Sequence, residues 1–172
     1  MRKLQNLSKN EQSELSTLFP DMEKLISAEE TESYTYIAIS VFDHWLGKED
    51  STEHLSNVSP KQQQKRDDKF NAFSNKIIEN TEVVNFTMRG RPSSAHPLFR
   101  RFLSELAKRE YMTRSSNYIS SKYFFKVALP ELKAIYFESW DDTNVFYLRD
   151  EKNVALLETW ANECGLYKLD KW

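Results

Sequence analysis

The feature of this sequence that most restricts its fold is a change in hydrophobic period along the chain. Phe70, Phe73 and Ile77 recur at helical spacing behind Ser59-Pro60, a pair typical of a helix N-terminus. The last third instead has the extended pattern of strands, in residues 122–129, 132–140 and 144–149. Helical segments followed by strands predict an α+β domain.

The remaining elements are predicted from local patterns. Helices are expected after the capping box Ser8-Lys9-Asn10-Glu11 and over residues 32–46, where Tyr34, Ile37, Val41 and Trp45 have helical spacing. Further predictions are an irregular connection over 48–60, a strand over 83–88, helices over 97–112 and 151–164, a polar turn over 141–144 and a short edge strand over 166–169. We therefore expect three to five mainly antiparallel strands packed against the last two helices.

The chain length and composition fit one domain. A chain of 172 residues buries about 70% of its unfolded surface, and 13% aromatic residues supply large side chains for a core. Only three glycines are present, which disfavours a phosphate-binding glycine loop and a β-sandwich with many turns. The prediction is a single domain over 1–172, helical over 8–80 and with the small sheet and its helices over 83–172.

The compartment is predicted from the cysteine content and the N-terminus. Cys164 is the single cysteine and can form no internal disulfide, which favours a reducing compartment. Polar residues follow the N-terminal charges, so neither a secretory signal nor a membrane span is expected. These features predict a cytoplasmic protein without a membrane partner.

Charge is sorted into blocks along the sequence. The net charge is −9 over residues 11–60, +8 over 61–133 and −4 over 134–172, although the whole chain carries only −2. Opposed blocks of this size can steer association with a macromolecular partner. In the alternative interpretation the blocks lie against each other in the fold and neutralise one another, because exposed ion pairs contribute only about 0–1 kcal/mol each.

Candidate binding residues lie in the basic segment 61–126. Arg89-Gly90-Arg91-Pro92 resembles the core of an AT-hook over those four positions, and an AT-hook places its arginines in the DNA minor groove. Lys122-Tyr123-Phe124-Phe125-Lys126 places aromatic side chains between positive charges, as a base-stacking strand would. The residues expected to contact nucleic-acid phosphates are Arg89, Arg91, Arg100, Arg101, Lys122 and Lys126.

Catalytic, metal-binding and cofactor-binding motifs are not evident in the sequence. His44, His54 and His96 lie in separate segments without the spacing of metal ligands, and Cys164 has no second thiol beside it. We expect no metal and no cofactor. An unrecognised enzyme remains an alternative, and it would require Arg91, His96 and an acidic side chain to meet in one cleft.

The preferred hypothesis is a non-enzymatic binding protein, such as a small regulator, an inhibitor or an immunity-type antagonist. It would engage a macromolecule through the acidic face of residues 11–60 or the basic face of residues 61–126, and a protein is favoured over nucleic acid as the partner. Nucleic-acid binding by the basic segment is the main alternative, and it predicts an affinity that falls steeply with salt.

Overall fold

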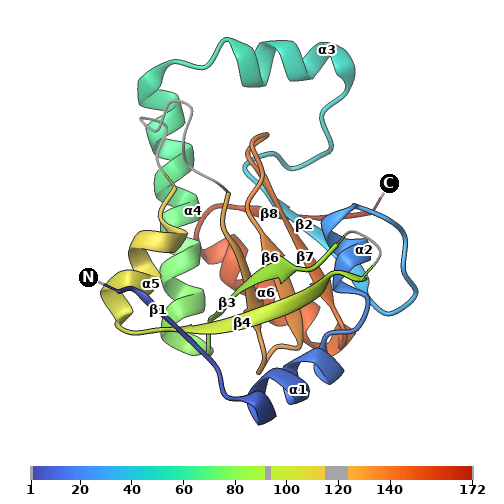
Figure 1. The fold of residues 1–172 in the computed structure, drawn as a ribbon. Coiled ribbons are helices and arrows are strands. Elements are labelled where there is room, and N and C mark those ends of the chain that lie inside the picture. The colour runs from blue at the N-terminus through green and yellow to red at the C-terminus, as the bar shows by residue number, and fades with distance from the viewer. Residues whose placement is uncertain (1, 92–93, 115–123, 172) are drawn as a thin grey trace.

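The structure, a computed structural model, describes residues 2–91, 94–114 and 124–171 of the chain. It forms one α+β domain, as the sequence predicted, in which helices lie on both faces of a single sheet (Figure 1). Among the described residues, no helix is both long and apolar enough to cross a membrane.

Eight strands form the sheet, in the order β1-β4-β3-β5-β6-β7-β2-β8, and every neighbouring pair is antiparallel. Their bounds are β1 Leu4–Asn6, β2 Thr35–Ser40, β3 Val84–Arg89, β4 His96–Phe102, β5 Lys126–Leu129, β6 Ala134–Phe137, β7 Thr143–Leu148 and β8 Tyr167–Asp170. The sheet is thus larger than the three to five strands expected from the sequence.

The helices lie between groups of these strands along the chain. Their bounds are α1 Lys9–Leu18, α2 Met22–Ile26, α3 Lys48–Ser51, the π-helix η1 Thr52–Ser56, α4 Pro60–Asn80, α5 Glu105–Met112, the 3-10 helix η3 Glu151–Asn153 and α6 Val154–Glu163. The predicted capping box is present where Ser8 caps α1, and Ser59 caps α4 with Pro60 in its first turn, as expected. Ser59 also forms a capping box with Gln62, which was not predicted.

The first face of the sheet packs on α4, α5 and α6. Phe73 of α4 is fully buried, and its ring meets Tyr136 of β6 and Phe146 of β7 edge to face at centroid distances of 6.1 and 6.0 Å. Tyr136 and Phe146 stack on each other at 4.0 Å. These rings lie at the centre of the larger core.

The second face is covered by α1 and α2 over only part of its width. Phe19, Met22 and Leu25 pack there on β3 to β6, in a smaller core that includes Phe86 and Phe99. The covering helices therefore leave side chains of β7 and β2 on this face half-buried, and Tyr36 and Tyr147 are among them.

The predicted helix over 32–46 is wrong, because residues Thr35–Ser40 form β2 between β7 and β8. Ile37 and Ile39 point into the larger core, whereas Tyr36 and Ala38 lie on the second face. Apolar residues on both faces of a central strand imitate helical spacing, and here the aromatic and β-branched residues indicated the correct state.

The predicted helix over 97–112 is wrong in its first half. Residues His96–Phe102 form β4 and pair with β3, so that Phe99 lies opposite Phe86 with ring centroids 6.2 Å apart. The helix begins only at Glu105, where the Ser104 hydroxyl accepts a hydrogen bond from the Ala107 amide. Pairing with β3 outweighed the helical spacing of Phe99 and Phe102.

The other predicted elements are confirmed, except the connection over 48–60. Strands occupy the extended segments of the last third where these are described, with residues 122 and 123 outside the described part, and the hairpin turn falls at Asp141-Asp142. Helix α6 and the edge strand β8 follow as expected. Within the predicted connection over 48–60 the chain instead forms α3 and η1.

Candidate functional site

The candidate functional site is the open part of the second sheet face, here called the aromatic face. It consists of Tyr34, Tyr36, Phe137 and Tyr147, which are all half-buried. Tyr147 is the central ring, and its centroid lies 6.3 Å from Tyr34, 5.6 Å from Tyr36 and 5.8 Å from Phe137. All three contacts are edge to face, an arrangement that makes these rings a fixed apolar surface.

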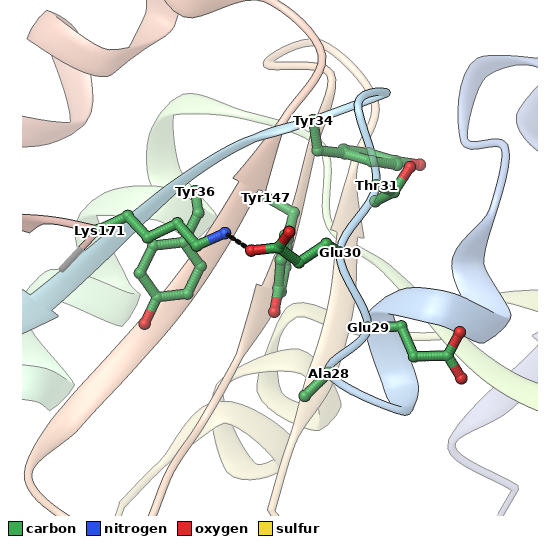
Figure 2. Close-up of a pocket in the computed structure, with 8 residues that line it drawn as sticks. All are labelled: Ala28, Glu29, Glu30, Thr31, Tyr34, Tyr36, Tyr147 and Lys171. Carbon is green, nitrogen blue, oxygen red and sulfur yellow. Dashed lines mark hydrogen bonds and ion pairs between the residues drawn. The ribbon is translucent and has the colours of Figure 1, made fainter.

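A hollow of about 330 Å³ lies between this surface and the loop that follows α2 (Figure 2). Ala28 and Thr31 of the loop form one side, and Glu30 reaches across to Lys171 with an O–N distance of 2.6 Å. The Tyr34 hydroxyl donates a hydrogen bond of 2.7 Å to the Pro20 carbonyl, which ties the face to the start of α2. The loop and the rings are therefore positioned relative to each other by polar contacts at both ends.

A second hollow of about 400 Å³ adjoins the first, since Ala28 and Tyr147 line both. Its margin carries two apolar side chains in solvent, Ile26 with 41% and Phe124 with 52% of their surface exposed. Exposed apolar side chains beside a hollow are typical of a binding surface.

Burial governs the titration of the tyrosines on this face. It raises the pKa of Tyr36 to about 12, and it also raises the pKa values of Tyr34 and Tyr147 above the ordinary value for tyrosine. Asp21 and Glu23 near Tyr34, and Asp141 near Tyr36, add to the effect. The shifts keep these phenol groups neutral well above physiological pH, so the face carries no tyrosinate charge there.

This titration predicts a loss of stability at alkaline pH. The folded-state pKa of Tyr36 lies above its unfolded value, so its contribution is complete below pH 10 and is lost as the pH rises through about 12. We expect Tyr36→Phe to keep the stability at pH 7 and to lose less than the natural protein between pH 10 and 12. Urea unfolding at several pH values measures this, and an unchanged alkaline loss in the variant would contradict it.

The basic residues predicted to bind phosphates do not form one surface. Arg100 and Arg101 are neighbours on β4 and point to opposite faces: Arg100 donates to Asn85 at 3.1 Å, and Arg101 contacts Glu11 of α1. Arg89 and Arg91 are exposed at the tip of the β3–β4 hairpin. Lys126 lines the second hollow on the other side of the sheet from Arg100, and Lys122 lies outside the described residues.

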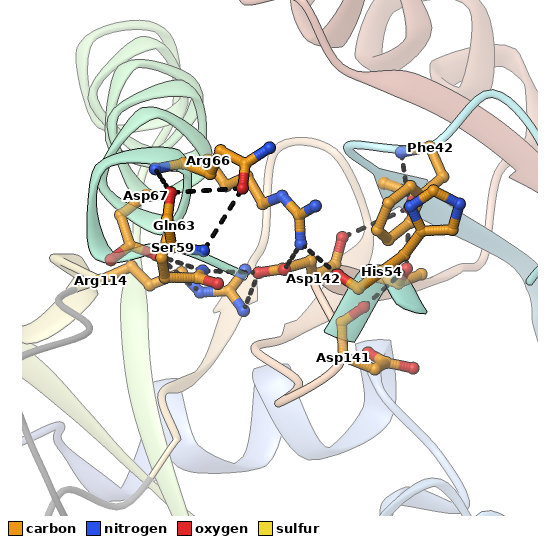
Figure 3. A network of polar contacts seen from close by, with 12 residues as sticks. Phe42, His54, Ser59, Gln63, Arg66, Asp67, Arg114, Asp141 and Asp142 are labelled. Atoms are coloured by element: carbon orange, nitrogen blue, oxygen red, sulfur yellow. Dashed lines mark hydrogen bonds and ion pairs between the residues drawn. The ribbon is translucent and has the colours of Figure 1, made fainter. Parts of the chain in front are cut away.

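Part of the basic segment is paired with carboxylates within the fold. Arg66 of α4 and Arg114 after α5 both reach Asp142 at 2.8 and 2.9 Å, and Arg114 also approaches Asp67 at 3.5 Å (Figure 3). Further basic residues of the segment contact carboxylates elsewhere, namely Lys76, Arg101, Arg109 and Lys133. Most of the carboxylates in these pairs come from the basic segment itself or from residues 134–172. These basic side chains therefore form ion pairs within the fold.

The acidic N-terminal block has a different environment. Glu29 and Glu32 are exposed in the loop after α2, and Glu30 shares its charge with Lys171. Of these glutamates, Glu29 and Glu30 line the first hollow of the aromatic face.

The remaining candidate catalytic and metal-binding residues lie in different parts of the fold. Arg91 and His96 are both exposed at the β3–β4 hairpin. Over the described ranges, no group of three histidine, cysteine or acidic side chains is placed to hold a metal ion. Cys164 is half-buried at the end of α6, where burial raises the pKa of its thiol.

The aromatic face was not predicted from the sequence. Tyr34 was assigned to the buried side of a helix, and Tyr147 lies 113 positions further along, so only strand pairing brings them together. One signal was present: in β7 the buried Phe146 and Leu148 flank a tyrosine, which places Tyr147 on the opposite face.

Comparison of the chain with protein-family models, with curated proteins and with solved structures finds no significant match.

Proposed function

We propose that this protein is a non-enzymatic binding protein that holds a segment of a partner protein on the aromatic face. The observation that carries the proposal is the half-covered second side of the sheet, where aromatic rings border two adjoining hollows. Rigid aromatic side chains contribute much of the binding energy at protein interfaces while losing little conformational entropy.

Charge beside the face favours a protein over nucleic acid. Glu29 and Glu30 line the first hollow, and their carboxylates would repel phosphates even though the tyrosines could stack on bases. The same carboxylates attract lysine or arginine side chains. The partner segment therefore combines aliphatic or aromatic side chains for the hollows with basic residues for the loop. We place this interaction in the cytoplasm, because the single cysteine suits a reducing compartment.

The experiment is a selection of random 12-residue peptides displayed on phage, followed by fluorescence anisotropy with the selected peptides. We expect enrichment of peptides that contain both apolar and basic residues. Ile26→Ser and Phe124→Ser should each weaken binding at least tenfold, because both side chains stand exposed at the second hollow and their loss costs little stability.

Leu106→Ser is the matched control, since Leu106 is 67% exposed on α5, on the other side of the sheet. Equal affinity of the selected peptides for all three variants would contradict the proposal. Single- and double-stranded oligonucleotides are titrated in parallel at low and physiological salt. Binding with a steep salt dependence, lost on changing Arg89 and Arg91, would support the nucleic-acid alternative instead.

A further inference from the structure

The two adjoining hollows of the aromatic face form a groove that crosses the strands of the sheet. Lys171, which follows β8, and Tyr36 of β2 line the first hollow. Tyr147 of β7 lines both hollows, and Phe137 of β6 and Lys126 of β5 line the second. The end of α2 and the loop after it form the opposite side (Figure 2). This cross-strand groove therefore runs across consecutive strands rather than along one of them.

The length of the cross-strand groove fits several turns of helix. From Lys171 beside β8 to Lys126 in β5, the order β5-β6-β7-β2-β8 gives four strand spacings. At about 4.8 Å each, these spacings make a length of about 19 Å. A helix covers this length with about 13 residues, at about 1.5 Å per residue.

The strands beneath the groove favour a helix over an extended peptide. β5, β6, β7 and β2 each have a neighbouring strand on both sides, and the hydrogen bonds between strands lie in the plane of the sheet. An extended peptide lying across these strands finds no backbone partners for its own N–H and C=O groups, which is costly wherever the groove excludes water. A helix satisfies the same groups within itself.

The two hollows differ in chemistry, as the two ends of an amphipathic helix can. Aliphatic and aromatic side chains make up most of the second hollow, and its polar lining consists of Lys126, Glu138 and Ser139. The first hollow has tyrosine rings on the sheet side, and its polar lining consists of Glu29, Glu30, Thr31 and Lys171. The second hollow thus suits the apolar side chains of a helix, which recur at i, i+3, i+4 and i+7.

Glu30 is the charged group at the first hollow that a partner can reach. It pairs with Lys171 of the same chain, and the side chains of Glu30 and Lys171 are 87% and 60% exposed. Exposed pairs of this kind contribute little to stability, so a basic side chain of a partner can replace Lys171 at small cost. Figure 2 shows Lys171 reaching Glu30 beside the tyrosine rings, where a cation also gains from the ring faces.

From this geometry we propose that the cross-strand groove binds an amphipathic α-helix of a partner protein. Its apolar side chains enter the second hollow and contact Tyr147, and an arginine or lysine near one end contacts Glu30. This inference rests on the proposed function and specifies the conformation of the partner segment.

The test compares two libraries of 16-residue peptides displayed on phage and selected on the full-length protein. Both libraries use the same amino acids in an alanine-rich sequence with an arginine at each end. In one library the varied apolar residues stand at i, i+3, i+4 and i+7, and in the other they alternate with polar residues as in a strand. We expect binders from the helical library to be at least tenfold tighter by fluorescence anisotropy, and to gain helix on binding by circular dichroism.

The outcomes separate this inference from the proposed function. Equal or tighter binding from the alternating library, or binding without a gain in helix, would overturn the helical partner and leave the proposed function standing. Absence of binders from both patterned libraries would also overturn it. If the random peptides fail to bind as well, the proposed function is contradicted too.

A pair of charge variants tests the contact with Glu30. Glu30→Lys should weaken binding of the arginine-bearing helix at least fivefold, and replacing the peptide's arginines by glutamate should reverse the preference. Glu14→Lys is the matched control, because it makes the same change of charge on α1, at an exposed residue outside both hollows. Equal losses in the two folded variants, or full affinity in Glu30→Lys, would overturn this contact.

Discussion

Asp142→Asn is expected to lower the free energy of unfolding by about 3–5 kcal/mol, the usual cost of removing one partner from a buried ion pair. The Asp142 side chain is 4% exposed and receives Arg66, Arg114 and Gln63. The side chains of Arg66 and Arg114 are only 16% and 10% exposed, so neither guanidinium is well solvated when the carboxylate is lost. Asparagine retains the shape and tolerates the φ of 56° at this position, which leaves the charge as the main change.

Asp68→Asn is the matched control for this prediction. Asp68 lies beside Asp67 on α4, is exposed and accepts a hydrogen bond from Gln64 at 2.8 Å. We expect it to change stability by less than about 0.5 kcal/mol. Urea unfolding monitored by circular dichroism compares the two variants at pH 7. A loss below about 1 kcal/mol for Asp142→Asn would mean that water reaches the network and screens both arginines.

Phe73→Ala is expected to destabilise the protein by about 3–5 kcal/mol through the cavity that it leaves. The Phe73 side chain is fully buried, and it connects α4 to the stacked pair Tyr136 and Phe146. Close packing around these rings restricts how far the surrounding side chains can collapse into the vacated space. Because α4 covers the first face of the sheet, we expect the loss in the global unfolding transition rather than in local fraying.

Thermal and urea unfolding of Phe73→Ala measure this effect, with Phe124→Ala as the control. Both changes remove a phenylalanine ring, but Phe124 is 52% exposed, so its loss creates little cavity. Phe73→Leu should recover most of the stability, since it refills much of the volume. Similar losses for the buried and the exposed phenylalanine would contradict the role assigned to this core.

Local sequence signals were reliable where one face of an element was buried. Ser59-Pro60 and the spacing of Phe70, Phe73 and Ile77 located α4, and the polar pair Asp141-Asp142 located the last hairpin turn. They failed in β2, a strand with apolar side chains on both faces, where alternation is hidden and helical spacing arises by coincidence. The prediction for the β4 segment failed for the same reason: Phe99 and Phe102 lie on opposite faces of the strand, and their spacing imitates that of a helix.

Site prediction was limited because charge along the chain does not show which charges meet in space. Arg66 and Arg114 belong to the basic segment, yet both end on Asp142, a residue that was interpreted only as part of a turn. Arg100 and Arg101 are adjacent in sequence and lie on opposite sides of the sheet. Tyr34 and Tyr147 are distant in sequence and lie ring to ring.

The amino-acid sequence specified the α+β class, the helix caps, the hairpin turn and most strands, because each of these depends on residues within a few positions of one another. Strand order, the partial cover of the second sheet face and the pairing of the charge blocks were settled by folding. These properties depend on contacts between distant segments, such as Tyr34 with Tyr147 and Arg114 with Asp142. Such contacts do not produce a hydrophobic period that the sequence would show.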